Sequence, residues 1–455
     1  MPATAIDSTI LHALFATDPM RRVFSDENRV QKYLDVEAAL ARAEARRGVI
    51  PQAAADEIGR HCRVEAFDLA ALAKDTAAIG APVQPVVNQL VKLCADGHGE
   101  WCHFGATTQD VTDTATVLQI AEALALIEAD LVTITDGLAA LARTHRDTVM
   151  AGRSYLQQAI PITFGHKIAV QLAAFLRHRA RLAEIKPRIL VGEFGGAVGT
   201  LASLGERGLA VEAALMQELG LGVPDITWHS ARDRFAEVGA FLGLVTGTCA
   251  KFALDLKLLM QTEIEEAAEP AQPGRGSSST MPQKRNPVAS ALIGAAVPLV
   301  RQQVAALLEA MVVDHERASG AWQIEWIALP EIFCLASGIL AHTRHLAAGL
   351  TVDAAKMRAN LDVTQGLVMA EAAVMGLAPH LGRQHAHHLV TAICRRVVEA
   401  GRPLADLLAE NEEIARHLDR ETIARLTDPA SYTGAAGAMV DRVLARYEQA
   451  GRRET

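Results

Sequence analysis

The sequence predicts an all-α fold in which a long central helix bundle is flanked by two smaller helical domains. Half of the residues are hydrophobic, while aromatic residues make up only 4%. Strands are enriched in aromatic and β-branched residues, so this composition favours helices. With 455 residues, the chain is long enough for about three domains and for a large buried core.

Four stretches in the middle of the chain carry apolar residues at alternating steps of three and four, which indicates long helices that each bury one stripe. The longest stripe consists of Val117, Ile120, Leu124, Ile127, Leu131, Ile134, Leu138 and Leu141. Two further stripes run from Phe235 to Leu259 and from Ile293 to Met311, and Ile168 to Leu182 is a shorter version. Helices of this kind pack at shallow crossing angles, as in a bundle.

The helical patterns change length along the chain and suggest three domains. Residues 1–112 carry short patterns that break near Pro51 and Pro82, and we expect them to form an N-terminal helical domain. Residues 113–355 hold the long stripes of the central bundle. Residues 356–455 return to short patterns separated by glycine and proline turns, which predicts a C-terminal helical domain.

Charge and cysteine usage limit the partners of the chain. The formal net charge of −9 argues against a general nucleic-acid binder but leaves room for a small basic pocket. The six cysteines form no C-x-x-C pair, so neither a zinc cluster nor a disulfide framework is expected. We also expect charges to interrupt each apolar helix before it reaches membrane-spanning length, and the N-terminus lacks the basic region of a signal peptide. These observations predict a cytoplasmic protein with no membrane partner.

Three polar segments lie beside the predicted long helices. The first, His103–Asp110, precedes the longest stripe, and its Thr107, Thr108 and Gln109 could hold a carboxylate at the positive end of a helix. The same Thr-Thr-Gln-Asp pattern is also that of an ordinary helix cap.

The second polar segment, Gly152–Pro161, offers Arg153 and Gln157 as anion contacts. We expect Pro161 to occupy the first turn of the following helix. Either polar residue could also be an ordinary surface side chain.

The third segment, Gly276–Pro287, combines glycines, serines, Lys284 and Asn286. Such a mobile loop with a cation and an amide donor can close on an anion.

The spacing of the first two segments predicts an oligomer. A helix from about Asp113 to Leu141 is roughly 40 Å long, so it separates the segments within one chain. They can share a pocket only when different copies meet, which predicts a homo-oligomer with closed symmetry and sites shared between subunits.

The three segments together resemble the fumarase/aspartase superfamily. The signature GSS-x-M-P-x-K-x-N-P is matched by Ser278–Pro287, with Ser277 in place of the glycine. Within the superfamily, HFGATTQDVTDT, GRSYLQQAIPITFGHK and DHERASGAWQIEWIALPE are most similar to the bacterial 3-carboxy-cis,cis-muconate cycloisomerases. The similarity extends over essentially the whole chain.

This resemblance implies an all-helical tetramer with sites built from three subunits and with neither a metal nor an organic cofactor. Ser278 matches the loop serine that moves a proton at the carbon next to a carboxylate, and Lys284 and Asn286 match the groups that hold this carboxylate. Thr107 and Thr108 match substrate-binding hydroxyls, and His103 matches a pocket histidine. Further candidates for substrate contacts are Gln109, Arg153, Tyr155, Gln157, Met281 and Arg285.

Two departures from the superfamily pattern point to the reaction. Many of its lyases have a histidine where this chain has Tyr155 and a glutamate where it has Ala291. That pair is understood to exchange a proton with a departing oxygen or nitrogen. Lactone formation needs no such help because its nucleophile is a carboxylate with a reference pKa of about 4. The expected activity is therefore conversion of 3-carboxy-cis,cis-muconate into a carboxymuconolactone in aromatic catabolism.

Several residues keep open roles. Ser278 is the first candidate for the proton donor to carbon, with His103 and His315 in reserve. A substrate with three carboxylates needs more cations, which Arg153, Arg232, Arg275 and Arg285 could supply, although Arg232 fits an exposed position on the first turn of a helix. We expect Trp322 and Trp326 to be packing residues, Gly195–Gly199 to be a turn, and His385, His387 and His388 to form a polar helix face rather than a metal site.

Three alternatives remain at this stage. The scaffold could serve an elimination lyase that releases fumarate from adenylosuccinate or argininosuccinate, or a cycloisomerase for 3-sulfomuconate. It could also belong to a non-catalytic structural protein.

Overall fold

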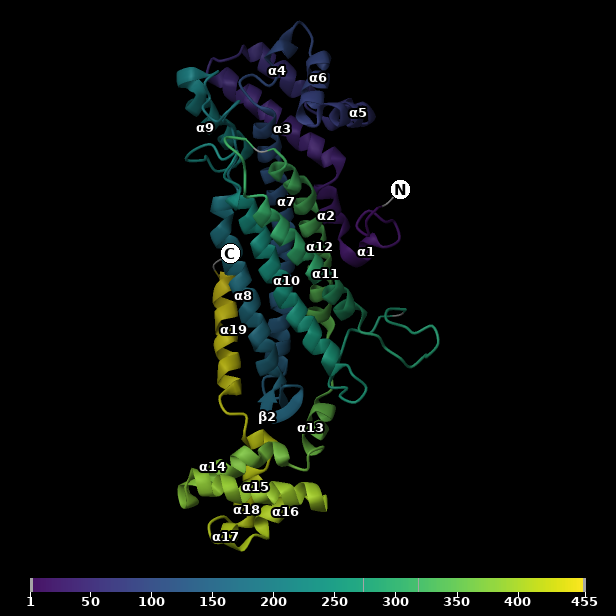
Figure 1. The fold of residues 1–455 in the computed structure, drawn as a ribbon, viewed down its shortest axis with the longest axis vertical. Helices are drawn as coiled ribbons and strands as arrows, with labels where there is room; N and C mark the ends of the chain where they lie inside the picture. Colours follow the sequence, from purple (N-terminus) through teal and green to yellow (C-terminus); the bar gives the residue numbers. More distant parts are fainter. Residues whose placement is uncertain (1–2, 273, 318, 453–455) are drawn as a thin grey trace. The chain divides into compact units, whose positions relative to one another are not determined.

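A computed structural model describes residues 3–272, 274–317 and 319–452, and its fold is all-α, as predicted (Figure 1). The residues form two compact units. Unit 1 gathers Met1–Leu131, His178–Cys249 and Leu292–Ala341, and unit 2 gathers Val132–Arg177, Ala250–Ala291 and His342–Thr455. Five long helices contribute to both: α7 (Thr108–Thr144), α8 (Phe164–Ile189), α10 (Asp233–Leu259), α11 (Val288–Glu309) and α12 (Ala321–Gly349). The three sequence domains remain a prediction.

The predicted apolar stripes are buried faces of these helices. The α7 stripe is fully buried from Val117 to Leu138, and no stripe residue of α10 is more than 5% exposed. In α11, Ile293, Val300 and Leu307 are buried, but the helix ends at Glu309. Met311 therefore lies beyond the helix, and the prediction was wrong at that position.

The fifth long helix, α12, was not among the four predicted stripes. Its buried residues include two runs close together, Ala328–Leu329 and Ile332–Ser337. A helix that is apolar on several sides shows no single stripe with steps of three and four, so periodicity does not reveal it.

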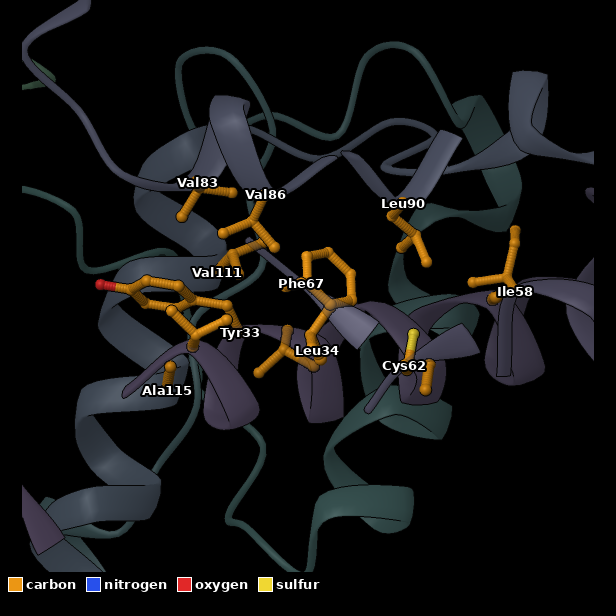
Figure 2. Close-up of a cluster of buried hydrophobic side chains, with 14 of the residues drawn as sticks. Tyr33, Leu34, Ile58, Cys62, Phe67, Val83, Val86, Leu90, Val111 and Ala115 are labelled. Atoms are coloured by element: carbon orange, nitrogen blue, oxygen red, sulfur yellow. The ribbon is translucent and has the colours of Figure 1, made fainter. Parts of the chain in front are cut away.

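Unit 1 also contains the N-terminal elements and two helices from the segment between α8 and α10. These are α1 (His12–Phe15), α2 (Asp18–Val23), α3 (Asp26–Arg46), α4 (Gln52–His61), η1 (Val64–Ala66), α5 (Leu69–Ile79), α6 (Val83–Leu93), η2 (His98–Trp101), η3 (Gly205–Arg207) and α9 (Gly208–Leu219). One core of this unit packs Tyr33 and Leu34 of α3 against Phe67, Leu90 and the α7 residue Val111 (Figure 2). This core ties α3 to the start of α7.

Unit 2 holds the remaining elements. They are β1 (Val149–Ser154), β2 (Gln157–Thr163), β3 (Ala267–Ala268), β4 (Thr351–Val352), α13 (Ala354–Asp362), η4 (Leu367–Met369), α14 (Ala370–Leu381), α15 (Arg383–Ala400), α16 (Leu404–Ala409), α17 (Glu412–Ala415), α18 (Arg420–Leu426), η5 (Pro429–Ser431) and α19 (Ala436–Arg452). Leu377, Ile393, Leu407 and Ile414 lie in the core that joins α14 to α17.

A β-hairpin replaces the expected approach to α8. Strands β1 and β2 pair antiparallel, and Pro161 lies opposite Ala151 within β2, so its predicted place in a first helical turn was wrong. Tyr155 and Leu156 form the turn with φ values of 51° and 64°. Such two-residue turns usually contain asparagine and glycine, so Tyr155 and Leu156 do not indicate a hairpin by residue type.

Three helices are apolar enough to cross a membrane by length and composition: α10, α11 and α12, or four spans if the bent pair Ala354–Asp362 and Leu367–Leu381 counts as one. The expectation that charges interrupt every apolar helix was therefore wrong. Helices that bury more than one face in a bundle are also apolar all round. Half of the apolar window of α10 and 67% of that of α12 are buried, but only 28% of that of α11.

Candidate active site

The first polar segment begins at His103, which a buried carboxylate on α3 fixes in place. The ring atom Nδ1 of His103 lies 2.6 Å from Oε1 of Glu37, and the backbone N–H donates to Oε2 at 3.1 Å. Burial lowers the pKa of His103, but the charge and hydrogen bond of Glu37, together with the charge of Asp110, outweigh it, so the pKa is raised. His103 is thus oriented and inclined to carry a proton.

The segment ends as a partial capping box at the start of α7. Oδ2 of Asp110 accepts the backbone N–H of Thr107 at 2.8 Å, which is the return half of such a box. The Thr107 hydroxyl is instead occupied by Arg317. The helix cap that the sequence left as an alternative is therefore made by the side chain of Asp110, whereas the Thr107 hydroxyl accepts a hydrogen bond from Arg317.

Arg317 is a candidate anion contact that sequence reasoning missed. Its guanidinium donates to the Thr107 hydroxyl, to Oε1 of Gln109 at 3.3 Å and to the carbonyl of Ala197 at 3.4 Å. Gln109 is only 1% exposed, so it accepts the hydrogen bond of Arg317 from the buried side. Thr108 opens α7, and its carbonyl accepts the hydroxyl of Thr112. Arg317 belongs to the segment DHERASGAWQIEWIALPE, which resembles the cycloisomerases. No sequence spacing linked this arginine to Thr107.

Three buried titratable groups lie behind this segment: Asp110, Glu193 and His229. Nε2 of His229 donates to Oδ1 of Asp110 at 2.7 Å, and Oε1 of Glu193 accepts the hydroxyl of Thr227 at 2.7 Å. Burial raises the pKa of Glu193 to about 7, although His229, the Thr227 hydroxyl and the N–H of Trp228 lower it. Burial lowers the pKa of His229, but the hydrogen bond to Asp110 and the surrounding carboxylates raise it overall. The cluster therefore retains protons near neutral pH.

The predicted exposure of Arg232 was wrong. Its side chain is fully buried and pairs with both Asp113 of α7 and Glu325 of α12. The indole of Trp322 donates to Asp113 at 3.0 Å and packs edge-on against Trp326, so the prediction of packing tryptophans is confirmed. Arg232 sits where α10 begins between two carboxylates, and this position follows from long-range packing rather than from the local cap pattern.

The glycine-serine loop belongs to unit 2 and has a closed neck. Ser277 and Arg285 form an antiparallel bridge, and the backbone N–H of Asn286 donates to the Gly276 carbonyl at 3.0 Å. A Cβ on Gly276 would lie 2.7 Å from the carbonyl oxygen of Asn286, and its φ is +70°. Only glycine fits this neck without a shift of Asn286.

Two cavities flank the neck of the loop, with volumes of about 400 and 870 Å³. Lys284, Arg285 and Asn286 line both, Arg275 lines the smaller and Met281 the larger. Among the described residues that line them, Ser278 does not appear. Its hydroxyl instead accepts the N–H of Met281 at 3.1 Å. The loop thus places Lys284, Arg285 and Asn286 at the cavities, while the Ser278 hydroxyl is bonded within the loop itself.

The hairpin residues of unit 2 are placed differently from one another. Arg153 makes a two-pronged ion pair with Glu266, at 2.8 and 2.6 Å, so its charge is already balanced. Tyr155 is fully exposed at the turn, and Gln157 begins β2 on the exposed side. These side chains are available to a neighbouring chain, whereas Arg153 is committed to its own.

The remaining candidate residues have structural positions and line none of the cavities described above. His385, His387 and His388 are exposed on α15, and His385 pairs with Glu413 at 2.6 Å. Gly195–Gly199 is a turn, with φ of +72° at Gly196 and +84° at Gly199. The polar helix face on α15 and the turn at Gly195–Gly199 are confirmed. His315 adopts a left-handed backbone, with φ of 50°.

Comparisons with known proteins cover nearly the whole chain. A family model described as lyase matches residues 14–300, more than half of the chain, and one described as adenylosuccinate lyase C-terminus matches residues 366–443. The chain is 49% identical to 3-carboxy-cis,cis-muconate cycloisomerase of Pseudomonas aeruginosa PAO1, over 97% of each protein. It is also 49% identical to trans-aconitate decarboxylase 1 of Mycosarcoma maydis, over 99% of this chain and 91% of that protein.

Among solved structures, the 3-carboxy-cis,cis-muconate lactonizing enzyme of Pseudomonas putida superposes with a TM-score of 0.91 at 45% identity, over 96% of this chain and 98% of that one. Sequence, fold and loop signature therefore agree that the chain belongs to the lyase family and is an enzyme of the fumarase/aspartase superfamily.

Proposed function

We propose that the chain is a cycloisomerase that converts 3-carboxy-cis,cis-muconate into a carboxymuconolactone in protocatechuate catabolism. The observation that carries the proposal is the replacement of the superfamily's histidine and glutamate by Tyr155 and Ala291. Ala291 lies in the first turn of α11 and has no group that can exchange a proton. A carboxylate nucleophile needs no such exchange, since its pKa is about 4. The full-length likeness to the Pseudomonas enzymes supports the same activity.

In the proposed reaction a carboxylate oxygen of the substrate forms the new C–O bond within the same molecule. The electron pair of the double bond moves into a neighbouring carboxylate as an enediolate, and a proton added to carbon completes the lactone. Because nucleophile and electrophile are already joined, the enzyme has to hold the reactive conformer and stabilise the new charge. Lys284, Asn286 and loop backbone N–H groups, which border the cavities of unit 2, suit the second task.

We assign the proton transfer to Ser278. Its hydroxyl now accepts an N–H within its own loop, so this role requires the loop tip to move towards the substrate. His103 is the reserve, because its raised pKa keeps a proton available.

We assign a second substrate carboxylate to Thr107, Thr108 and Arg317. Arg317 is the only one of these with a full charge, and a guanidinium matches a carboxylate in geometry. Arg285 and Arg275 at the cavities of unit 2 suit the third carboxylate.

The active form is proposed to be a homotetramer with sites shared between subunits. The support is the apolar but poorly buried α11, whose window is only 28% buried, with Leu299 44% and Leu308 52% exposed. An exposed apolar helix of this length requires a cover, and a second copy in a closed assembly supplies one. The exposed Tyr155 fits a position that acts on a neighbour.

Cys62, Cys94, Cys102, Cys334 and Cys394 are free cysteines, as is usual in a reducing compartment. This supports a cytoplasmic location.

Turnover of 3-carboxymuconate tests the proposal through the loss of diene absorbance. We expect Lys284→Ala to lower kcat/KM at least a hundredfold, as removal of a charge-stabilising donor commonly does. Lys92→Ala, an exposed change on α6, should leave it unchanged. Full activity of Lys284→Ala would show that the site is elsewhere.

A second candidate function is decarboxylation of trans-aconitate, because the relative with that name is as similar as the bacterial cycloisomerase. Trans-aconitate also carries three carboxylates beside a double bond, so the same cations suit it. Release of CO₂ from trans-aconitate with no change of diene absorbance would favour this candidate. Fumarate release from adenylosuccinate or argininosuccinate would favour an elimination lyase, and faster turnover of the 3-sulfo diene a sulfomuconate cycloisomerase.

A further inference from the structure

The buried cluster of Asp110, Glu193 and His229 has no part in the reaction proposed above. The exposed fractions of the three residues are 1%, 0% and 2%, so none of them can touch a substrate. Burying three titratable groups is costly unless they are well paired. Their hydrogen bonds show what the cluster holds together.

Asp110 joins two chain segments that are far apart in the sequence. Oδ1 accepts Nε2–H of His229 at 2.7 Å and the N–H of Gly195 at 2.8 Å. Oδ2 accepts the N–H of Thr107 at 2.8 Å and that of Gly196 at 3.0 Å. One carboxylate therefore fixes the start of α7 against the turn that begins at Gly195.

The turn itself has almost no room to move. A Cβ on Gly195 would lie 2.7 Å from the Thr227 hydroxyl and 3.1 Å from Cε1 of His229. A Cβ on Gly196 would lie 3.1 Å from the carbonyl oxygen of Gly105. The turn is thus packed directly on the cluster on one side and on the His103–Asp110 segment on the other.

Both segments that Asp110 holds accept hydrogen bonds from the same cation, Arg317. Arg317 donates to the Thr107 hydroxyl on one segment and to the Ala197 carbonyl on the other. A shift of either segment would move at least one of the groups that accept hydrogen bonds from Arg317. The position of the guanidinium therefore depends on a carboxylate that it does not contact.

Glu193 completes the cluster from the far side. It accepts the Thr227 hydroxyl and the backbone N–H of Trp228, and its own backbone N–H and carbonyl pair with the Thr114 hydroxyl of α7. Nδ1 of His229 lies 3.3 Å from the Thr227 hydroxyl oxygen. His229 is thereby placed between two carboxylates, because its Nε2 lies 2.7 Å from Oδ1 of Asp110 and 3.6 Å from Oε1 of Glu193.

We propose that Asp110, His229 and Glu193 are positioning residues that hold the Gly195–Ala197 turn against the start of α7, so that Thr107 and Arg317 form a preformed site for a carboxylate. This deepens the proposed function, because it takes that pair as a substrate carboxylate site. Their role is to fix the anchors of Arg317 and to keep a proton among buried carboxylates.

Other charged groups of unit 1 face the cluster and enter its proton balance. They are His103 with Glu37, Asp113 with Arg232, and Glu212 of α9. The pKa of Glu193 is raised to about 7, so the cluster gives up this proton around neutral pH, where a free carboxyl would already have lost it. The added negative charge repels the carboxylate of Asp110, so the hydrogen bonds of Asp110 to the turn should weaken at that point.

The test is the affinity of the full-length protein for tricarballylate, a tricarboxylate that cannot cyclise, measured by calorimetry from pH 7 to 9. We expect Asp110→Asn to weaken binding at least tenfold at pH 7. In an Arg317→Gln background the same change should weaken binding less than twofold further, since both act on one site. Glu57→Gln changes a buried carboxyl of α4 that accepts the backbone N–H of Ala95 and lies outside the cluster; it is the matched control and should change affinity less than twofold.

The pH profile gives an independent reading if Asp110→Asn does not fold. Wild-type affinity should fall above pH 7, whereas Glu193→Gln, which cannot lose that proton, should keep its affinity to higher pH. A purely structural role would lower the melting temperature without changing this profile. The proposal is overturned if Asp110→Asn binds within twofold of wild type, if its effect multiplies fully with that of Arg317→Gln, or if Glu193→Gln keeps the wild-type profile.

These results are separable from the failure of the proposed function. If the wild-type protein does not turn over 3-carboxymuconate but Asp110→Asn loses tricarballylate binding, the proposed function fails and the positioning role stands. Turnover with unchanged binding in that variant would retain the function and reject the role.

Discussion

Arg153 and Glu266 form a two-pronged ion pair in unit 2, with N–O distances of 2.8 and 2.6 Å. Glu266 is completely buried, and Nδ2 of Asn360 donates to the same carboxylate at 2.9 Å. An arginine that seemed free for a substrate in the sequence is therefore part of the scaffold that carries the hairpin.

Removing Arg153 should destabilise the protein strongly. We expect Arg153→Met to lower the free energy of unfolding by about 3 kcal/mol, because it leaves Glu266 as an unpaired buried charge. The double variant Arg153→Met/Glu266→Leu should recover part of this loss. Urea denaturation measures both, and Arg358→Met, which breaks an exposed pair with Asp362, should change stability by less than about 1 kcal/mol. Equal effects of the two arginine changes would contradict the buried pair.

Glu44 should make stability depend on pH. Its side chain is 1% exposed, neither carboxyl oxygen has a hydrogen-bond partner among the described residues, and burial, with the charge of Glu37, raises its pKa to about 9. The folded chain then holds a proton that the unfolded chain has lost above pH 4.5. The contribution of this carboxyl is fully present below pH 4.5 and is lost as the pH rises to about 9, by up to about 1.4 kcal/mol per pH unit.

Denaturation of Glu44→Gln across this pH range checks the effect. The variant should show a flatter stability curve than wild type, while Glu399→Gln, an exposed change on α15, should follow the wild-type curve. Parallel curves for wild type and Glu44→Gln would mean that Glu44 finds a partner in solution.

The neck of the glycine-serine loop should tolerate no side chain at Gly276. An added Cβ would lie 2.7 Å from the Asn286 carbonyl oxygen, so we expect Gly276→Ala to displace Asn286 and to lower kcat/KM for 3-carboxymuconate at least tenfold. Gly274→Ala is a close control because its φ is also positive, +78°, but nothing lies within 4 Å of the new Cβ. Both variants bear the same backbone strain, and only the first bears the collision. Similar activities would show that the neck is adaptable.

The exposed side of α11 should govern assembly. We expect Leu299→Glu/Leu308→Glu to turn the oligomer into smaller species in sedimentation velocity and to abolish turnover, because charges in an apolar contact lose burial and gain desolvation cost. Val398→Glu changes another exposed apolar residue, 73% exposed on α15, and should leave the assembly intact. A wild-type chain that sediments as a monomer at working concentration would remove the basis for shared sites.

Much of the fold could be predicted because the long helices bury one-sided stripes. Val117 to Leu138 repeats at helical spacing, and this repeat is a local property of the sequence. The α12 helix escaped notice because Leu329 and its neighbours are buried on several sides. The hairpin escaped notice because Tyr155 and Leu156 are not turn formers.

The site was predictable in its segments but not in its contacts. The loop with Lys284 and Asn286 and the segment with His103 stood out by composition and by resemblance. Arg317 and His229 did not, because their partners Thr107 and Asp110 lie 210 and 119 positions away in the chain. Arg232 was misjudged for the same reason: a local pattern placed it outside, and packing among three helices placed it inside.

The turn at Tyr155 and Leu156 has a thermodynamic consequence for the isolated chain. Both residues occupy left-handed backbone conformations, which disfavour bulky side chains by roughly 1 kcal/mol or more each, and the Tyr155 ring gains no burial in return. Replacing the pair by Asn-Gly would relax the hairpin of a lone protomer. Burial of the ring by another molecule would offset this cost, so the stability of one chain would depend on its contact with the next.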